Sequence, residues 1–268
     1  MNKKIGFIGS GNMAKAMIGG IIKSGLVDSK NLISSDLNES ILDPIRNEFN
    51  INTTTKSEEV VKNSDIIIVA VKPNIYDIVL ESVKEFIDNE KVIVTIAAGK
   101  TIKSIENVIG EDKKIIRTMP NTPALVGEGM SAICKNKNIT DEELEMVKTI
   151  FSSFGKAEIV NEYLIDSVIG VSGSAPAYVF MFIEAMADAA VLYGMSRSQA
   201  YKFAAQAVMG SAKMVLETGK HPGELKDMVC SPGGTTIEAV KTLEAEGFRS
   251  AVINAMCDCM EKSKEMSK

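Results

Sequence analysis

Two short segments of the sequence combine residue types that bind anions. The first, residues 231–236, reads Ser-Pro-Gly-Gly-Thr-Thr and runs into a pattern that predicts a helix over 236–246. Glycines and hydroxyls before a helix could present free N–H groups around one point, which suits an anion. The same residues could instead form a capped loop, with Thr235 or Thr236 as the helix N-cap. The residues alone leave both interpretations open.

The second segment is a glycine-rich turn near the N-terminus. Gly9-Ser10-Gly11-Asn12-Met13-Ala14 follows a strand candidate and opens a helix candidate. In a dinucleotide fold the first glycine turns the chain, the second lets a pyrophosphate approach the backbone, and a small third residue allows close packing. Asp36 ends the next strand candidate, where the ribose contact is expected. The predicted cofactor residues here are Gly9, Ser10, Gly11, Asn12, Met13, Ser35 and Asp36.

The choice between the two nicotinamide dinucleotides stays open at this stage. An acid at Asp36 favours the ribose hydroxyls of NAD and repels the extra phosphate of NADP. Ser34 and Ser35 are small donors beside it, and the first arginine that follows is Arg46.

Small residues also follow the third and fourth strand candidates. Open sheets bind ligands at the carboxyl ends of their strands, and small side chains there leave room for a nicotinamide and its ribose. We therefore add Ala70, Val71, Lys72, Pro73, Ala97 and Ala98 to the cofactor site. Ordinary strand-to-helix turns are the alternative, and Lys72 could be either an acid or a solvated lysine.

The elements that position these segments change in character along the chain. Continuous apolar runs predict parallel strands covered on both faces, at 4–9, 31–35, 65–71, 91–98 and 114–120, with 130–136 and 156–160 extending the sheet. Later residues show helical periodicity over 197–218, 222–229, 236–246 and from 248, with a capping-box pattern at Ser196-x-x-Gln199. We expect an α/β Rossmann domain with a doubly wound, mostly parallel sheet at 1–162, then an all-α domain at 163–268.

Composition narrows the function classes. The 268 residues are 45% hydrophobic, with a net charge of −5 and no large basic cluster, so a nucleic-acid partner is not expected. No Cys-x-x-Cys occurs and His221 is the one histidine, so no metal site is expected. No secretory signal is evident, and reduced thiols in a cytoplasmic protein fit the four cysteines.

One apolar stretch resembles a membrane span in composition. Residues 177–194 carry Glu184 and Asp188 in mid-segment, which are costly in a bilayer. We therefore expect a buried helix in a soluble protein. A methionine-rich stripe is assigned to core and dimer packing; it comprises Met181, Met186, Met195, Met209 and Met214.

Longer motifs carry a family resemblance. The glycine turn, Ala-Val-Lys-Pro at 70–73, Arg-Thr-Met-Pro-Asn-Thr-Pro at 117–123 and Gly-Val-Ser-Gly-Ser-Ala-Pro-Ala-Tyr at 170–178 together resemble pyrroline-5-carboxylate reductase. The likeness is densest in the second half, at 221–240 and 247–256.

The resemblance implies NAD(P)H-dependent reduction of 1-pyrroline-5-carboxylate to L-proline, with NADPH as cofactor and NADH possible. It implies a helical second domain that forms a homodimer, which in the family is often assembled into a decamer. It also implies that the substrate carboxylate binds to Ser231, Gly233, Gly234, Thr235 and Thr236, with Thr236 near the ring nitrogen as the catalytic residue. The segments at 119–123 and 171–176 could contact ligand or be structural.

Two other functions fit the first domain. A β-hydroxyacid dehydrogenase needs a lysine three residues after an asparagine in its helical domain. Here Leu164 and Cys257 stand at that spacing from Asn161 and Asn254, so the motif is absent. A catalytically silent dinucleotide-binding regulator would not need the segment at 231–236.

Overall fold

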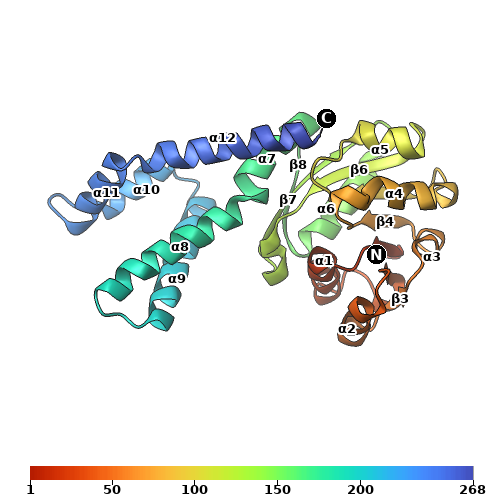
Figure 1. Ribbon diagram of the computed structural model, residues 1–268, viewed down its shortest axis with the longest axis horizontal. Helices are drawn as coiled ribbons and strands as arrows, with labels where there is room; N and C mark the ends of the chain where they lie inside the picture. The colour runs from red at the N-terminus through yellow and green to blue at the C-terminus, as the bar shows by residue number, and fades with distance from the viewer. Residues whose placement is uncertain (268) are drawn as a thin grey trace. The chain divides into compact units, whose positions relative to one another are not determined.

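The first part of the chain forms one eight-stranded sheet. In this computed structural model, which describes residues 1–267, the strand order is β3-β2-β1-β4-β5-β6-β7-β8 (Figure 1). Neighbouring strands are parallel except for the antiparallel pair β6 and β7. The strands are β1 Ile5–Ile8, β2 Leu32–Ser35, β3 Asn52–Thr54, β4 Ile66–Val69, β5 Val92–Thr95, β6 Lys114–Met119, β7 Gly129–Lys135 and β8 Gly155–Ile159. The predicted mostly parallel sheet is confirmed.

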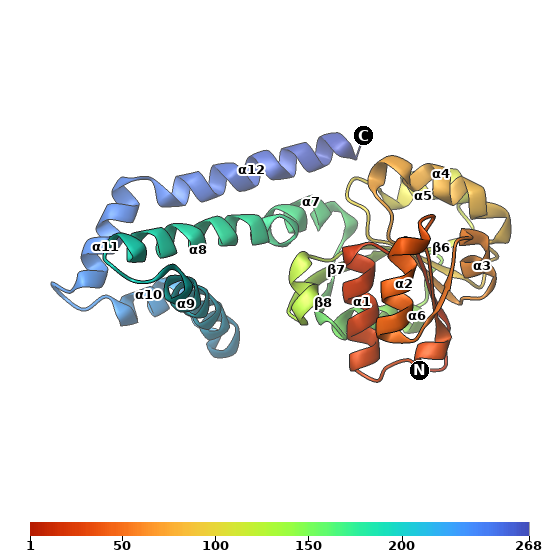
Figure 2. The same ribbon diagram turned by 60° about the horizontal axis from the view of Figure 1, so that its bottom comes forward.

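Helices cover both faces of this sheet. The helices are α1 Asn12–Lys23, α2 Glu39–Phe49, α3 Ser57–Lys62, α4 Pro73–Val83, α5 Ile102–Ile109, α6 Asp141–Ser152 and α7 Ile165–Val168. Helices α1, α2 and α6 pack in one hydrophobic cluster (Figure 2), and α3, α4, α5 and α7 pack in the other. Strand β4 shows why the apolar runs are continuous: Ile66 and Ile68 belong to the first cluster, and Ile67 and Val69 to the second.

Short helical turns complete this part of the chain. The 3₁₀ turns are η1 Ser29–Asn31, η2 Lys84–Phe86, η3 Thr122–Val126 and η4 Glu162–Leu164, and η5 Ile169–Gly173 is a π-helix. The π-helix follows α7 directly and ends where the second part of the chain begins.

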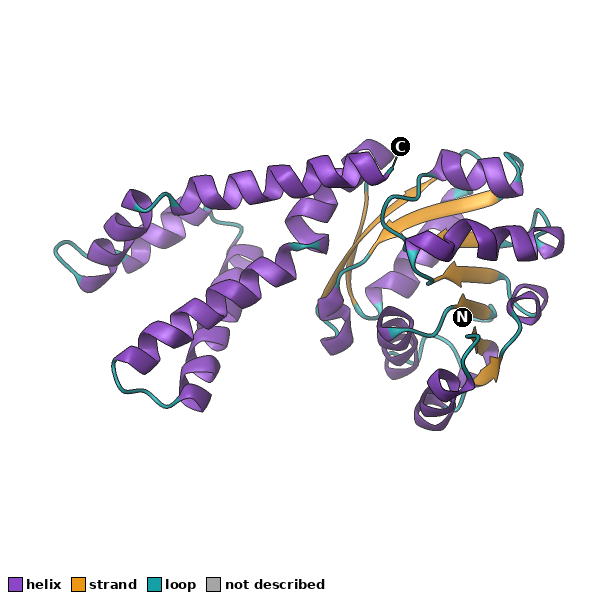
Figure 3. Ribbon diagram, viewed as in Figure 1, coloured by secondary structure: helices purple, strands orange, loops and turns teal. Residues whose placement is uncertain are grey.

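The second part is built from helices, and the strands all lie in the sheet unit (Figure 3). Its helices are α8 Ala175–Leu192, α9 Arg197–Thr218, α10 Pro222–Val229, α11 Thr235–Ala245 and α12 Phe248–Met266. By internal contacts the helical unit spans Ala175–Asp258, and the chain from Cys259 onward belongs with the sheet unit. This division follows contacts, whereas the expected boundary at 162/163 follows the change from strands to helices.

The expectation of a buried helix at 177–194 is wrong for the single chain. Of the described residues in α8 only Ala187 is buried, while Phe180 and Met181 are 64% and 70% exposed. The methionine stripe likewise does not form a core within one chain, since Met209 is 57% exposed. A span of 31 residues, Glu162–Leu192, is long and apolar enough to cross a membrane, and 6% of its most apolar window is buried.

Most other elements lie where the sequence predicts them. Helices α9 and α10 have the expected bounds, and α11 begins one residue earlier, at Thr235. The capping box at α9 is wrong: the Ser196 hydroxyl donates to Gln199 Oε1 at 2.7 Å, and no side chain caps the backbone. Strand β3 was missed because its three residues, Asn-Thr-Thr, are polar and lie at the sheet edge.

A pair of glycines on α1 tests how closely this helix packs. A Cβ at Gly20 would lie 2.5 Å from Phe154 Cβ, whereas one at Gly19 would lie 3.3 Å from the tip of the Phe49 ring, which can move slightly. Both changes to alanine favour the helix equally. We therefore expect Gly20→Ala to have a lower free energy of unfolding than Gly19→Ala, by about 1–3 kcal/mol. Urea unfolding at one protein concentration measures this difference, and equal midpoints for the two variants would contradict it.

Candidate active site

The glycine turn after β1 is held between the two neighbouring strands. Gly9 has a φ of 96°, and a Cβ there would lie 2.7 Å from the carbonyl oxygen of Ala70. Its N–H donates to the carbonyl of Ser35 at 2.8 Å. Glycine is therefore required at position 9 both by backbone conformation and by the close approach of the chain that follows β4.

Asp36 binds the same turn from the end of β2. Its Oδ2 accepts from the Ser10 N–H at 3.2 Å and its Oδ1 from the Asn38 N–H at 3.1 Å. The Ser10 hydroxyl pairs with that of Ser34 at 2.7 Å, and both side chains are buried. Ser35 is also buried, at 1% exposure, so its hydroxyl faces the interior rather than a ligand. Asp36 remains half-buried at the surface of the turn.

The N-terminus of α1 is open at Gly11. Gly11 is the N-cap of α1, and no side chain caps the helix. A Cβ built on Gly11 would meet no atom within 4 Å, so the space above its backbone is free. The N–H groups of the first helical turn, at Asn12 and Met13, have no acceptor within the helix. This uncapped terminus beside empty space fits the pyrophosphate of a dinucleotide.

The remaining predicted cofactor residues follow β4 and β5 at the same sheet edge. Ala70, Val71 and Pro73 are half-buried, while Lys72 is exposed and is the N-cap of α4. Ala97 is buried and its N–H donates to Thr95 Oγ1 at 3.2 Å, whereas Ala98 is half-buried. Because β1, β4 and β5 pair in parallel, these residues and the glycine turn share one edge.

The segment at 231–236 forms a tight turn in the helical unit. Gly233 has a φ of 69°, which favours glycine at this position. A Cβ on Gly234 would lie 2.6 Å from Ser231 Oγ and 3.1 Å from the Ser231 carbonyl oxygen, so the turn is tight there as well. The Gly234 N–H donates to the Ser231 carbonyl at 3.0 Å, which closes the turn. This N–H is therefore occupied by the turn itself.

The alternative of a threonine cap is wrong. The N-cap of α11 is Gly234, which has no side chain, so the helix begins at Thr235 without a side-chain cap. The N–H groups of Thr235, Thr236 and Ile237 occupy the first turn and have no acceptor within the helix. Thr235 is exposed and Thr236 half-buried. An uncapped helix N-terminus of this kind can accept an anion, and the hydroxyls of Thr235 and Thr236 belong to its first turn.

Comparisons with known proteins identify the family. The model described as pyrroline-5-carboxylate reductase dimerisation matches residues 162–266, and the one described as NADP oxidoreductase coenzyme F420-dependent matches 4–99. The chain is 56% identical over 268 residues to pyrroline-5-carboxylate reductase of Escherichia coli (strain K12), with all of both chains covered. The chain belongs to the pyrroline-5-carboxylate reductase family.

Two further relatives of this family cover the chain. The reductase of Methanosarcina acetivorans is 47% identical over 267 residues, covering 100% of this chain and 99% of the relative. The crystal structure of Plasmodium falciparum pyrroline carboxylate reductase with NADP bound has a TM-score of 0.91 and 35% identity, and the match covers 100% of this chain and 99% of that one. The family resemblance stated from the sequence motifs is confirmed.

His221 caps a helix, and Cys134 is buried in the sheet unit. His221 is the N-cap of α10, and its Nδ1 accepts from the Gly223 N–H at 3.0 Å. All four cysteines are free thiols. Burial raises the pKa of the Cys134 thiol to about 12, so this thiol stays protonated.

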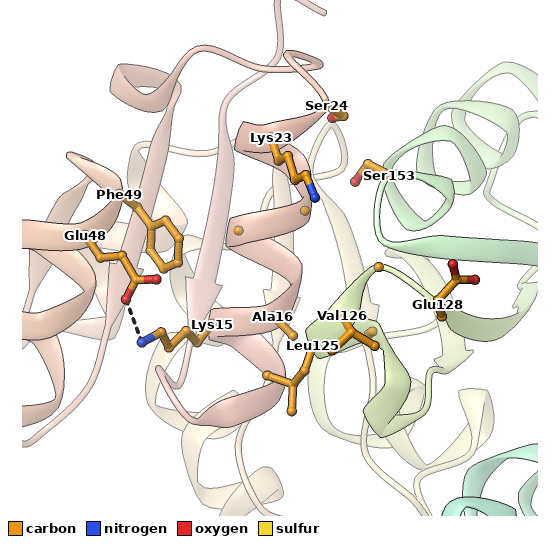
Figure 4. A pocket seen from close by; sticks show the side chains of 14 residues that line it. Lys15, Ala16, Lys23, Ser24, Glu48, Phe49, Leu125, Val126, Glu128 and Ser153 are labelled. Carbon is orange, nitrogen blue, oxygen red and sulfur yellow. Dashed lines mark ion pairs between the residues drawn. The ribbon is translucent and has the colours of Figure 1, made fainter. Parts of the chain in front are cut away.

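A cavity of about 660 Å³ lies along the side of α1, away from its N-terminus (Figure 4). Lys15 and Lys23 of α1 face it, together with Leu125 and Val126 of η3. Lys15 is paired with Glu48 at 2.6 Å, so this lysine is already neutralised. The cavity contains none of the residues assigned to the cofactor or the substrate.

Two polar residues near the end of β6 lie in the motif at 117–123, but neither is among the site residues assigned from the sequence. Arg117 is 3% exposed and pairs with Glu162 at 2.9 Å, and the same carboxylate oxygen accepts from the Ile102 N–H at 2.8 Å. Asn121 is 9% exposed and joins three segments of the sheet unit. Their sequence signal is the motif at 117–123, of which the segment 119–123 was expected either to contact ligand or to be structural.

Two glycine variants separate folding from dinucleotide binding. Gly11→Ala places its Cβ in free space, so we expect its free energy of unfolding to change by less than about 1 kcal/mol. The same Cβ would obstruct a pyrophosphate at the backbone, so affinity for a reduced dinucleotide should fall about tenfold or more. Gly9→Ala, which meets the Ala70 carbonyl, should instead lower stability by about 1–3 kcal/mol. Cofactor fluorescence titration and urea unfolding measure both quantities; unchanged binding by Gly11→Ala would refute the site.

Proposed function

We propose that this protein reduces 1-pyrroline-5-carboxylate to L-proline with NADPH, the last step of proline biosynthesis. The observation that carries the proposal is the full-length similarity to reductases of this family, at 56% identity to the Escherichia coli enzyme. Two features of the structure support it: an uncapped helix N-terminus at the edge of a Rossmann sheet, and a second uncapped terminus after the glycine turn at 231–236.

The cofactor residues are assigned from their positions in the sheet unit. Gly11, Asn12 and Met13 would hold the pyrophosphate on a turn that Gly9 and Ser10 shape, and Asp36 would border the adenosine ribose. Ser35 would support this site through its carbonyl, which accepts from the Gly9 N–H. Bound NADPH supplies the hydride that reduces the imine carbon. Small residues at 70–73 and 97–98 would leave space for the nicotinamide ring.

NADPH is preferred over NADH in this proposal, with NADH possible. The residues 4–99 match a family described as an NADP oxidoreductase, and a 35% identical relative has been crystallised with NADP. Arg46, the first arginine after β2, is engaged by Glu39 at 2.8 Å and by Asp43 at 2.7 Å. Recognition of an extra phosphate would therefore rest on other groups near Asp36, such as backbone N–H groups.

The substrate residues act through position and charge. The free N–H groups of Thr235 and Thr236, with Gly233 and the Ser231 hydroxyl, would hold the substrate carboxylate, while Gly234 fixes the turn. The Thr236 hydroxyl would lie near the ring nitrogen. The imine reacts in its protonated form, so the carbon accepts a hydride and the nitrogen keeps its proton as the positive charge is removed. Holding the ring while excluding water is then the main task of the chain.

The helical domain is proposed to form a homodimer that assembles further into a decamer. Residues 162–266 match a dimerisation family, and α8 exposes apolar side chains such as Phe180 and Met181 in the single chain. A second copy, rather than lipid, would cover this helix, because Glu184 and Asp188 interrupt its apolar sequence. No nucleic-acid partner is proposed for a chain with a net charge of −5.

The functional domains are proposed to divide at 162/163, with dinucleotide binding at 1–162 and substrate binding and dimerisation at 163–268. The dimerisation match begins at residue 162 and supports this division. A cytoplasmic location is proposed as well, since four free thiols are typical of a reducing compartment.

The activity is tested by mixing the protein with 1-pyrroline-5-carboxylate and either NADPH or NADH, and following the absorbance of the reduced cofactor. We expect turnover with both and a higher kcat/KM with NADPH. A dinucleotide-binding regulator would bind the cofactor without consuming it, and that result would overturn the proposal. Formation of L-proline is confirmed by chromatography of the products.

Thr236 tests the positioning mechanism. Thr236→Ala is expected to lower kcat by about 10- to 1000-fold, as loss of one oriented polar group does. Thr236→Ser should recover most of this loss, because it restores the hydroxyl. Thr242→Ala on the same helix, whose hydroxyl donates to the Glu238 carbonyl, is the control and should keep its activity. A fall of Thr236→Ala to the uncatalysed rate would show that Thr236 is an obligate acid.

Met181 tests the dimer interface. Met181→Glu places a charge on an apolar helix face and should shift the protein to a lower oligomeric state, with loss of activity. Ile78→Glu on α4 is the matched control, because Ile78 and Met181 are both 70% exposed in the single chain. Sedimentation velocity measures the state of each variant. An unchanged assembly of Met181→Glu would place the interface elsewhere.

A further inference from the structure

Asn121 lies at the edge of the sheet where the cofactor residues gather. It stands two residues beyond Met119, the last residue of β6. Strand β6 pairs in parallel with β5, so its carboxyl end shares an edge with the ends of β4 and β5. The side chain of Asn121 is nevertheless turned inward and is 9% exposed.

Each polar atom of this amide is bound to a different segment. Asn121 Oδ1 accepts from the Met130 N–H at 2.8 Å, at the beginning of β7. Since a backbone N–H can only donate, the oxygen must face Met130 and the amide nitrogen must face Ser172. Asn121 Nδ2 donates to the Ser172 carbonyl at 3.2 Å and lies 3.1 Å from the Ser172 hydroxyl.

Ser172 belongs to the π-helix, which is a rarely populated conformation. The wide turn is closed by the Ser174 N–H, which donates to the Ile169 carbonyl at 2.8 Å. π-helical turns are short, and they occur frequently at functional sites. A backbone of this kind persists where surrounding contacts define it. Asn121 supplies two such contacts from the sheet edge.

Other contacts hold the same segment. A Cβ built on Gly173 would lie 3.8 Å from Met119 Sδ, so the π-helix lies close to the end of β6. The thiol of Cys259 donates to Ser174 Oγ at 3.2 Å. Asn121 is the member of this set that also binds β7, so it fixes the π-helix and the sheet edge relative to each other.

We infer that Asn121 is a positioning residue for the reductase: through Ser172 it holds the π-helix against the carboxyl edge of the sheet, where the nicotinamide is expected. This inference rests on the proposed function. Its consequence is that loss of the Asn121 donor should impair turnover more than cofactor binding, because the pyrophosphate site at Gly11 lies on other elements.

The variant Asn121→Asp tests this role with little change in shape. It keeps an oxygen for the Met130 N–H and replaces the donor toward Ser172 by a second acceptor, which repels the Ser172 carbonyl. We expect kcat to fall roughly 10- to 100-fold, as small misplacements do, while the Kd for NADPH changes by less than about threefold. Ser131→Ala is the control, because the buried Ser131 hydroxyl on β7 has no hydrogen-bond partner among the described residues. Its kcat should stay within about twofold of the wild type.

Hydrogen exchange provides a readout independent of activity. In Asn121→Asp, amides of the peptide covering 169–174 should exchange at least roughly tenfold faster, while peptides covering 5–13 keep their wild-type rates. Ser172→Ala, a milder change that removes one acceptor, gives the same pattern to a smaller degree and serves if Asn121→Asp fails to fold.

Two results would overturn the inference: a folded Asn121→Asp enzyme with wild-type kcat, or faster exchange spread evenly over the sheet unit, which would mark a general loss of stability. If the wild type itself does not reduce pyrroline-5-carboxylate, the proposed function fails. The exchange pattern then still decides whether Asn121 holds the π-helix, so the two failures are distinguishable.

Discussion

The cofactor side of this protein depends on how closely the end of β1 fits between its neighbours. Gly9 donates to the carbonyl of Ser35 on one side and lies against the carbonyl of Ala70 on the other. A side chain at this point would separate β1 from the chain that follows β4. The close fit directs the chain into α1, brings Asp36 onto the Ser10 N–H, and leaves the backbone of Gly11 facing free space. One glycine therefore sets the geometry of the whole turn.

The helical unit is subject to a different constraint, because it buries little apolar surface by itself. Its buried apolar residues are Ala187, Ala200, Ala204 and Leu225, and large side chains such as Phe203 and Leu216 are 67% and 83% exposed. Burial on this scale does not offset the conformational entropy of ordering five helices. Residues 162–266 match a dimerisation family. Association of two chains can bury the apolar side chains that one chain leaves exposed. The stability of the helical unit is thus expected to depend on its assembly.

The sheet was predicted well from the sequence, because a continuous apolar run indicates a strand whose side chains are buried on both faces of the sheet. Strand β4 is the clearest case, with alternate isoleucines in the two clusters. Strand β3 was not predicted, because a polar edge strand of three residues has no apolar run. The burial of α8 was mispredicted for a related reason: hydrophobicity shows that a residue is covered but not which chain covers it. The segments at 119–123 and 171–176 were noted in the sequence, but the contact between Asn121 and Ser172 could not be predicted, since it joins residues 51 positions apart.

The two helix N-termini assigned to ligands share glycine at the N-cap. Side chains cap α2 by Asn38, α5 by Thr101, α6 by Thr140 and α10 by His221, and each cap accepts from one first-turn N–H. Helices α3, α4 and α9 have no side-chain cap, but their N-caps are residues with side chains. Helices α1 and α11 have glycine at the N-cap instead. Glycine at this position costs only a few tenths of a kcal/mol relative to a polar cap, so stability changes little while the N–H groups stay open.

The two open termini suit two different anions, a pyrophosphate at α1 and a carboxylate at α11. In the proposed function both sites would work through backbone N–H groups, which every sequence has, at N-caps that carry no side chain. This explains why a search for acids, bases and nucleophiles finds few candidates in this chain. The chemistry asked of the protein is to hold two anionic groups in place, and a protonated imine needs little further activation to accept a hydride.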